Sequence, residues 1–158
     1  MGVKAVMLNG VDVTDMPLTF GTKDQSITDL EVVLTNRVLE LSGAVTDDRG
    51  QSVADCSVIV FATDGNLWDQ VSRYVATDMP DGDGKFSVQG LPDGEYFAAA
   101  IDRTVHGEWQ NPALLESVVR SATRVTLTEG RNTTVTLKLI ARWPRAIPEL
   151  RDCISSIP

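Results

Sequence analysis

The stretch DGDGKFSVQGLPDGEYFAAA, residues 81–100, decides the fold of this 158-residue chain. Its glycines supply tight turns, because a residue without a Cβ adopts positive φ at little cost. Phe86 and Val88 alternate with Lys85 and Ser87, which is the period of two that is typical of a half-buried β-strand. The run LPDG has the preferences of a type I turn, so we expect it to reverse the chain into the next strand. The stretch contains no His, Cys or evident nucleophile, and it therefore predicts a scaffold.

The period of two recurs along most of the chain, with mostly apolar residues sharing one face at every second position. These positions are Leu30, Val32 and Leu34; Leu39, Leu41, Gly43 and Val45; and Thr133, Val135, Leu137 and Leu139. Residues 57–63 and 95–101 are apolar at nearly every position, as expected for central strands that are covered on both faces. Turn signals such as DDRG (47–50) and EGRN (129–132) separate the strands. The sequence predicts an all-β fold, an antiparallel β-sandwich.

One segment has the pattern of a helix. Within residues 111–122, Asn111 is a good N-cap and Pro112 suits the first helical position. The apolar residues then form one stripe at helical spacing: Leu114, Leu115, Val118 and Val119. We expect a single short helix lying against a sheet edge, where it would cover unpaired backbone groups.

The chain divides into three predicted parts. Residues 1–37 form a strand segment, either the end of a preceding domain or an added edge. Residues 38–141 form the β-sandwich. Residues 142–158 lose the alternation and contain several prolines, so we expect an irregular tail.

Composition limits the classes of partner. The net charge is −8, so the chain repels nucleic-acid phosphates and anionic membrane surfaces. No apolar run approaches the roughly 20 residues of a membrane span. The apolar start breaks at Asn9 and Gly10, which is too early for a signal peptide. Cys56 lies in an apolar strand and Cys153 near the end, so we expect neither to form a disulfide or a metal site.

Residues for catalysis are scarce. His106 is the one histidine, and one histidine cannot build a zinc site alone. No G-x-S-x-G motif of a serine hydrolase occurs. Asp78, Asp81 and Asp83 resemble the start of a calcium loop, but Gly90 stands where the twelve-residue loop needs a Glu, so a solvated turn is favoured. The sequence predicts no catalytic residue, no metal and no cofactor, and hence no enzyme.

Two tryptophans are the candidate ligand-binding residues. Trp68 and Trp109 lie in polar loops together with Asn66, Asp69 and Gln110. An exposed indole with amides nearby is suited to stacking on a sugar ring, so carbohydrate binding is one interpretation. The other is that each tryptophan closes an end of the core.

Two longer motifs carry a family resemblance. The pattern G-x-V-x-D-x-x-G falls at Gly43, Val45, Asp47 and Gly50, and D-G-x-F-x-V-x-G-L-P-x-G-x-Y spans 83–96. Together they resemble the carboxypeptidase regulatory-like family, over roughly residues 38–140 when the segment after Glu108 is included. The resemblance implies a transthyretin-like (prealbumin-like) β-sandwich without catalytic activity. That later segment is similar to a bacterial version found towards the end of large surface or secreted proteins, which implies an extracellular or cell-surface location.

From this resemblance we expect a structural or interaction module of a larger extracytoplasmic bacterial protein. Its expected partners are neighbouring domains or other copies of the protein, bound by strand pairing, because open sheet edges make such pairing easy. The alternative is a carbohydrate-binding module that uses its exposed tryptophans to hold a polysaccharide.

Overall fold

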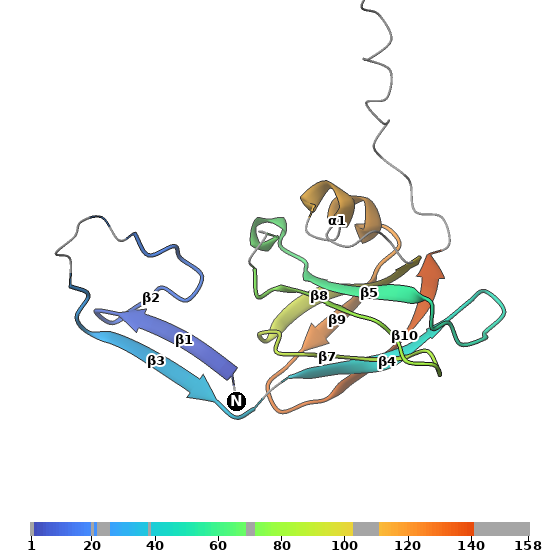
Figure 1. Ribbon diagram of the computed structural model, residues 1–158, viewed down its shortest axis with the longest axis horizontal. Helices are drawn as coiled ribbons and strands as arrows, with labels where there is room; N and C mark the ends of the chain where they lie inside the picture. Colours follow the sequence, from blue (N-terminus) through green and yellow to red (C-terminus); the bar gives the residue numbers. More distant parts are fainter. Residues whose placement is uncertain are drawn as a thin grey trace, which may run out of the picture.

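The computed structural model describes residues 2–19, 21, 26–37, 39–68, 72–102 and 111–140. Within these ranges the chain is mostly β-strand, with one α-helix and two sheets (Figure 1). Three strands come first: β1 (Gly2–Leu8), β2 (Val11–Asp12) and β3 (Leu30–Thr35). The others are β4 (Glu40–Thr46), β5 (Cys56–Ala62), β6 (Val75–Asp78), β7 (Lys85–Gln89), β8 (Gly94–Asp102), β9 (Thr123–Leu127) and β10 (Thr133–Ile140), with a 3₁₀ turn η1 (Gly65–Leu67) and the helix α1 (Pro112–Val119).

Strands β4 to β10 form a sandwich, as the sequence predicts. One layer contains β7, β4 and β10, and the other contains β6, β5, β8 and β9. Strand β10 joins the layers, because it pairs with β4 over most of its length and with β8 at its end. Both pairings of β10 are parallel, and the other strand pairs of the sandwich are antiparallel, as the sequence predicts.

The predicted alternation places the core between these layers. Phe86 and Val88 of β7 are buried, and Lys85 and Ser87 between them face outward. Alternate residues of β4, β5, β8, β9 and β10 complete the same cluster. Tyr96 of β8 is a buried member of this cluster and donates its hydroxyl hydrogen to the carbonyl of Pro92 at 2.8 Å.

The LPDG run connects the two layers instead of closing a hairpin. Strand β7 pairs with β4, whereas β8 pairs with β5, β9 and β10. The expected change of direction into the next strand is confirmed, and that strand lies in the other layer. The turn residues were read correctly as a change of direction, but turn preferences do not specify the layer in which the next strand lies.

The helix begins where the sequence predicts. The Asn111 side chain accepts a hydrogen bond from the backbone N–H of Ala113 at 3.0 Å, and Pro112 occupies the first turn. Leu115 and Val118 are buried in a second cluster with residues of β5 and β8. Because β5 and β8 are inner strands, α1 covers the outer face of that layer and not a sheet edge as expected. This explains why β5 and β8 are apolar on both faces.

Strands β1, β2 and β3 form a separate sheet with the order β2-β1-β3. It lies beside the sandwich in Figure 1, joined to it by the chain that leads from β3 to β4. The turn between β1 and β2 is made by Asn9 and Gly10, which both have positive φ, as two-residue hairpins require. The division at residue 37 stays a prediction, and residues 141–158, including the expected tail, lie outside the described ranges.

Candidate interaction surface

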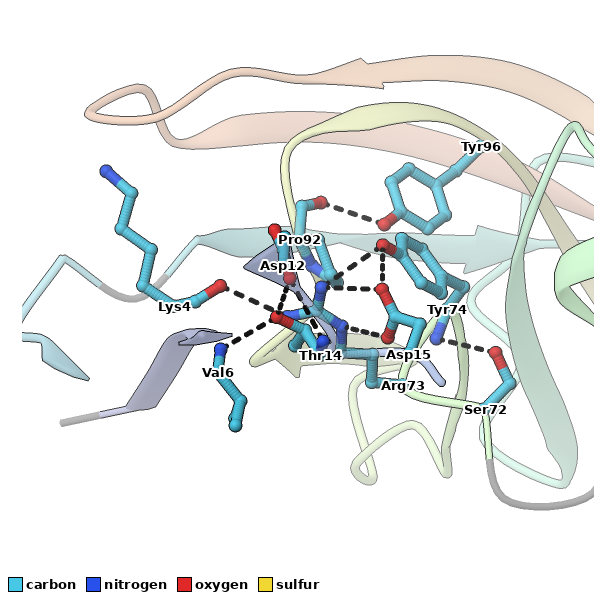
Figure 2. A network of polar contacts seen from close by, with 10 residues as sticks. All are labelled: Lys4, Val6, Asp12, Thr14, Asp15, Ser72, Arg73, Tyr74, Pro92 and Tyr96. Carbon is cyan, nitrogen blue, oxygen red and sulfur yellow. Dashed lines mark hydrogen bonds and ion pairs between the residues drawn. The ribbon is translucent and has the colours of Figure 1, made fainter. Parts of the chain in front are cut away.

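A polar cluster connects the three-stranded sheet to the sandwich (Figure 2). Asp15 follows β2, and Arg73 and Tyr74 immediately precede β6. Both carboxylate oxygens of Asp15 accept from the Arg73 guanidinium, at 2.7 Å from Nε and 2.9 Å from Nη2. The Tyr74 hydroxyl donates to Asp15 Oδ2 at 2.9 Å. Arg73 Nη1 also donates to the carbonyl of Lys4 in β1 at 3.4 Å. We call Asp15, Arg73 and Tyr74 the latch.

The latch is fixed from both sides. Tyr74 packs against the main core, and its backbone carbonyl accepts from Ala62 at 3.0 Å, so its hydroxyl has a defined position. On the other side Thr14 donates to Asp12 and accepts from the Val6 backbone N–H at 2.8 Å, which holds the turn before Asp15. A second contact, between Lys4 and Glu129 at 3.6 Å, is more exposed. The latch is therefore the better-defined link between the regions.

The charges of the latch stabilise one another. Hydrogen bonds from Arg73 lower the pKa of the Asp15 carboxyl below its ordinary 3.8, against a smaller opposing effect of burial. The same interaction raises the pKa of the Arg73 guanidinium. Burial is the main cause of the raised pKa of Tyr74. The cluster is thus an ion pair at neutral pH with Tyr74 as a neutral donor, which suits a structural contact.

One face of the three-stranded sheet is apolar and exposed. Residues directly opposite each other in neighbouring strands point to the same face, so the registers identify its members. They are Val3, Val6, Leu8, Val11, Leu30, Val32 and Leu34. Five of them are half exposed: Val3 52%, Val11 59%, Leu30 46%, Val32 49% and Leu34 54%. We call these seven residues the apolar face. Such a contiguous surface is typical of sites that contact another protein.

The same sheet has an open edge. Strand β3 is the last strand in the order β2-β1-β3, and no described strand pairs with its other side. The Asn9 N–H donates to the Asp29 carbonyl at 3.2 Å, so odd-numbered residues of β3 bond towards β1. The even-numbered residues Leu30, Val32 and Leu34 therefore direct their backbone N–H and C=O groups to the open edge. The three residues that expose apolar side chains also expose backbone groups for pairing.

The predicted ligand-binding residues are only partly described. Trp68 ends η1, and its indole N–H donates to the Ala62 carbonyl at 2.7 Å. Its ring meets Phe61 edge-on, with 5.4 Å between the centroids. Asn66 is exposed, and its side-chain amide donates to Asp64 at 2.8 Å. The contacts of Trp68 favour closure of the core, the second interpretation given above. Trp109, Asp69 and Gln110 lie outside the described residues, so carbohydrate binding stays a prediction.

The aspartates of the suspected calcium loop organise backbone turns. Asp81 Oδ1 accepts from the N–H groups of Asp83 and Lys85, both at 2.9 Å, and Asp78 accepts from Ser87 at 2.8 Å. Among the described residues, no group of three His, Cys, Asp or Glu side chains is placed to hold a metal. In that part of the chain, no helix has the length and apolar character needed to cross a bilayer.

Of the two cysteines and the histidine, Cys56 lies within the part of the chain that the structure describes. Cys56 is buried in β5 with a free thiol, and burial raises its pKa to about 11. Such a thiol is protonated at neutral pH and is a poor nucleophile. Cys153 and His106 lie outside the described residues.

Comparison with known proteins gives similarity of fold at low identity. No family model and no curated protein sequence matches the chain. Among solved structures, the Bacillus anthracis TIE protein is 15% identical, with a TM-score of 0.41 over 72% of this chain and 18% of that one. A streptococcal ancillary pilin is 13% identical, with a TM-score of 0.44 over 77% of this chain and 37% of the pilin.

A third structure, a Pseudomonas aeruginosa protein provisionally described as carbohydrate-binding, is 14% identical, with a TM-score of 0.42 over 66% of this chain and 91% of that one. This chain therefore spans well under half the length of the first two. At such identities and TM-scores these similarities carry no argument about family or function.

Sequence patterns did not reveal the latch. Asp15 and Arg73 are 58 positions apart, and neither belongs to a motif. The apolar alternation of β3 was recognised, but its exposure was not, because alternation identifies a face without showing what covers it.

Proposed function

We propose that the chain is a non-catalytic interaction module of a larger extracytoplasmic bacterial protein, and that its three-stranded sheet receives a β-layer from a neighbouring domain or another copy. The observation that carries this proposal is the coincidence of the apolar face and the open edge on strand β3. A partner strand paired with the β3 edge would satisfy the free backbone groups, and a partner layer packed on the apolar face would cover the exposed side chains.

The latch supports the same proposal. A sheet that served only as a loose end would need no bidentate ion pair to the sandwich. Here Asp15, Arg73 and Tyr74 connect the sheet to the sandwich, and the partly buried Tyr74 packs against the core. Fixing the orientation in advance lowers the entropy lost when a partner binds.

The motifs at 43–50 and 83–96 support membership of the carboxypeptidase regulatory-like family, and through it the bacterial and extracytoplasmic setting. Within the described residues, the carboxylates that first indicated chemistry bind backbone groups, which supports a scaffold role.

An immunoblot of fractionated source cells tests the setting. We expect a band much larger than 17.1 kDa at the surface or in the medium. A 17 kDa band confined to the cytosol would contradict the proposal.

Photo-crosslinking in the same cells tests the surface. A benzophenone amino acid at Val32 should give crosslinked products, and the same group at Thr126, an exposed position on β9, should not. Equal labelling from both positions, or none from Val32, would contradict an interaction through the three-stranded sheet.

A further inference from the structure

We propose that the partner of the β3 edge is β3 of a second copy, paired antiparallel about a twofold axis that passes beside Val32. This inference rests on the proposed function and names the partner of the same surface. It starts from the backbone. A twofold axis perpendicular to a sheet pairs residues of equal parity, and in β3 the even-numbered residues direct their N–H and C=O groups outward.

In this arrangement the apolar side chains of β3 in one copy lie opposite those of β3 in the other copy. With the axis at Val32, Leu30 of one copy lies opposite Leu34 of the other, and Val32 lies opposite itself. All three residues are half exposed in the single chain, and each gains an apolar neighbour on the same face. Three hydrogen-bonded residue pairs result, with two backbone bonds in each pair.

The charges that flank β3 also fit an antiparallel copy. Asp29 precedes the strand and Glu31 lies in its first half, whereas Arg37 follows its end. None of the three makes an ion pair within the described residues. An antiparallel copy brings the basic end of one strand beside the acidic end of the other. Thr35 then lies opposite Asp29 of the other copy, and Arg37, two residues further on, is the diagonal neighbour of Asp29 at about 7–8 Å, which its side chain can span.

The expected association is weak. Pairing along six residues buries less than the roughly 800 Å² per partner of a standard stable interface. We therefore expect a dissociation constant on the order of 10–1000 μM, relevant where copies are held close together.

Amide hydrogen exchange of the full chain, measured at about 5 μM and about 1 mM, is the first test. Sedimentation over the same range should show a concentration-dependent dimer. At the high concentration the amides of Leu30, Val32 and Leu34 should gain protection, and those of Glu31 and Val33, already bonded to β1, should not. A monomer at all concentrations overturns the proposal. A dimer without this alternation also overturns it and indicates packing through the apolar face.

Substitutions separate the backbone contribution from the charge contribution. Val32→Pro removes an N–H that bonds only across the new interface, and proline is tolerated at such edge positions. It should raise the dissociation constant at least about tenfold, because both central bonds are lost. Val32→Ile keeps the N–H and should leave the constant within about threefold. Equal dimerisation of Val32→Pro and Val32→Ile overturns the proposal.

If Val32→Pro disturbs the sheet itself, a charge reversal outside the strand still tests the proposed dimer. Arg37→Glu lies after β3 and should weaken the dimer about threefold or more, by placing two acidic groups side by side. An unchanged constant would contradict the proposed register. Failure of the dimer leaves the proposed function open, since crosslinking at Val32 to a different protein in the source cells would still support it.

Discussion

The sandwich and the three-stranded sheet have the same sequence pattern and opposite environments. In β4, Leu41 and Val45 are fully buried, whereas Leu34 of β3 is 54% exposed although it belongs to the same kind of alternation. In the sandwich a second layer faces each alternating strand, and α1 covers the outer face of the layer that contains β5 and β8. Nothing described covers the apolar face of the three-stranded sheet. The pattern therefore determines that a strand has an apolar face, and the rest of the chain or a partner determines whether that face is covered.

Matched leucine substitutions should give the largest difference between the regions. Leu41→Ala removes a fully buried side chain between two layers and should cost about 2–5 kcal/mol of unfolding free energy. Leu34→Ala removes a half-exposed one and should cost less than about 1 kcal/mol. Urea denaturation of the isolated chain measures both. Similar costs would mean that the apolar face is covered in the isolated chain.

A pair of glycines sharpens the comparison. A Cβ on Gly43 would lie 1.9 Å from the Val135 carbonyl of β10, and would also meet the ring of Phe86. Gly43→Ala must therefore push β4 away from β10, at about 3 kcal/mol or more. A Cβ on Gly2 of β1 meets nothing within 4 Å, so Gly2→Ala should be neutral. Thermal unfolding of the two variants tests this, and a stable Gly43→Ala protein would contradict the tight approach of these strands.

The close approach at Gly43 shows what sequence can and cannot predict. Alternation placed Gly43 on the inward face, and caps predicted α1 from Asn111, since both are local properties. The parallel pairing of β10 with β4 joins residues about ninety positions apart, and no local signal specifies it. The same is true of the latch, where side chains distant in sequence meet only after the strands have packed.

Trp68 distinguishes a core role from a ligand role. Trp68→Phe loses the hydrogen bond to the Ala62 carbonyl and part of the contact with Phe61, so we expect a cost of about 1–2 kcal/mol. Chemical denaturation measures it. Asn66→Ala, at an exposed neighbouring position, is the matched control and should change the unfolding free energy little.

Polysaccharide binding makes a different prediction for the same loop. It requires that the chain be retained on a glycan and that retention be lost when Trp68 and Trp109 are both replaced by Ala. If no glycan retains the wild-type chain and Trp68→Phe is destabilised, the results would support only the role of Trp68 in the core.

Weakening the latch should loosen the contact between the three-stranded sheet and the sandwich more than it lowers the stability of either region. Arg73→Lys keeps the charge but loses the bidentate geometry, and exposed ion pairs contribute about 0.5–1 kcal/mol. Amide exchange should rise in β1 and in the turn before Asp15, while β5 and β8 stay protected. Uniform acceleration across the sandwich would show that the two regions unfold as one cooperative unit.

Acid should break the ion pair of the latch, and the expected change in unfolding free energy is small. Because Arg73 lowers the pKa of Asp15 below 3.8, the folded protein favours the ionised carboxylate. The stabilisation is complete above the unfolded value near 3.8 and is lost as the pH falls through the lower folded value. The difference in unfolding free energy between wild type and Asp15→Asn should be constant above about pH 5, at most about 1 kcal/mol, and should decline as the pH falls below 3.8 until the pH lies below the lowered folded pKa. A difference that persists in acid would mean that Asp15 acts through its shape and hydrogen bonds, because the protonated acid and the amide then still differ.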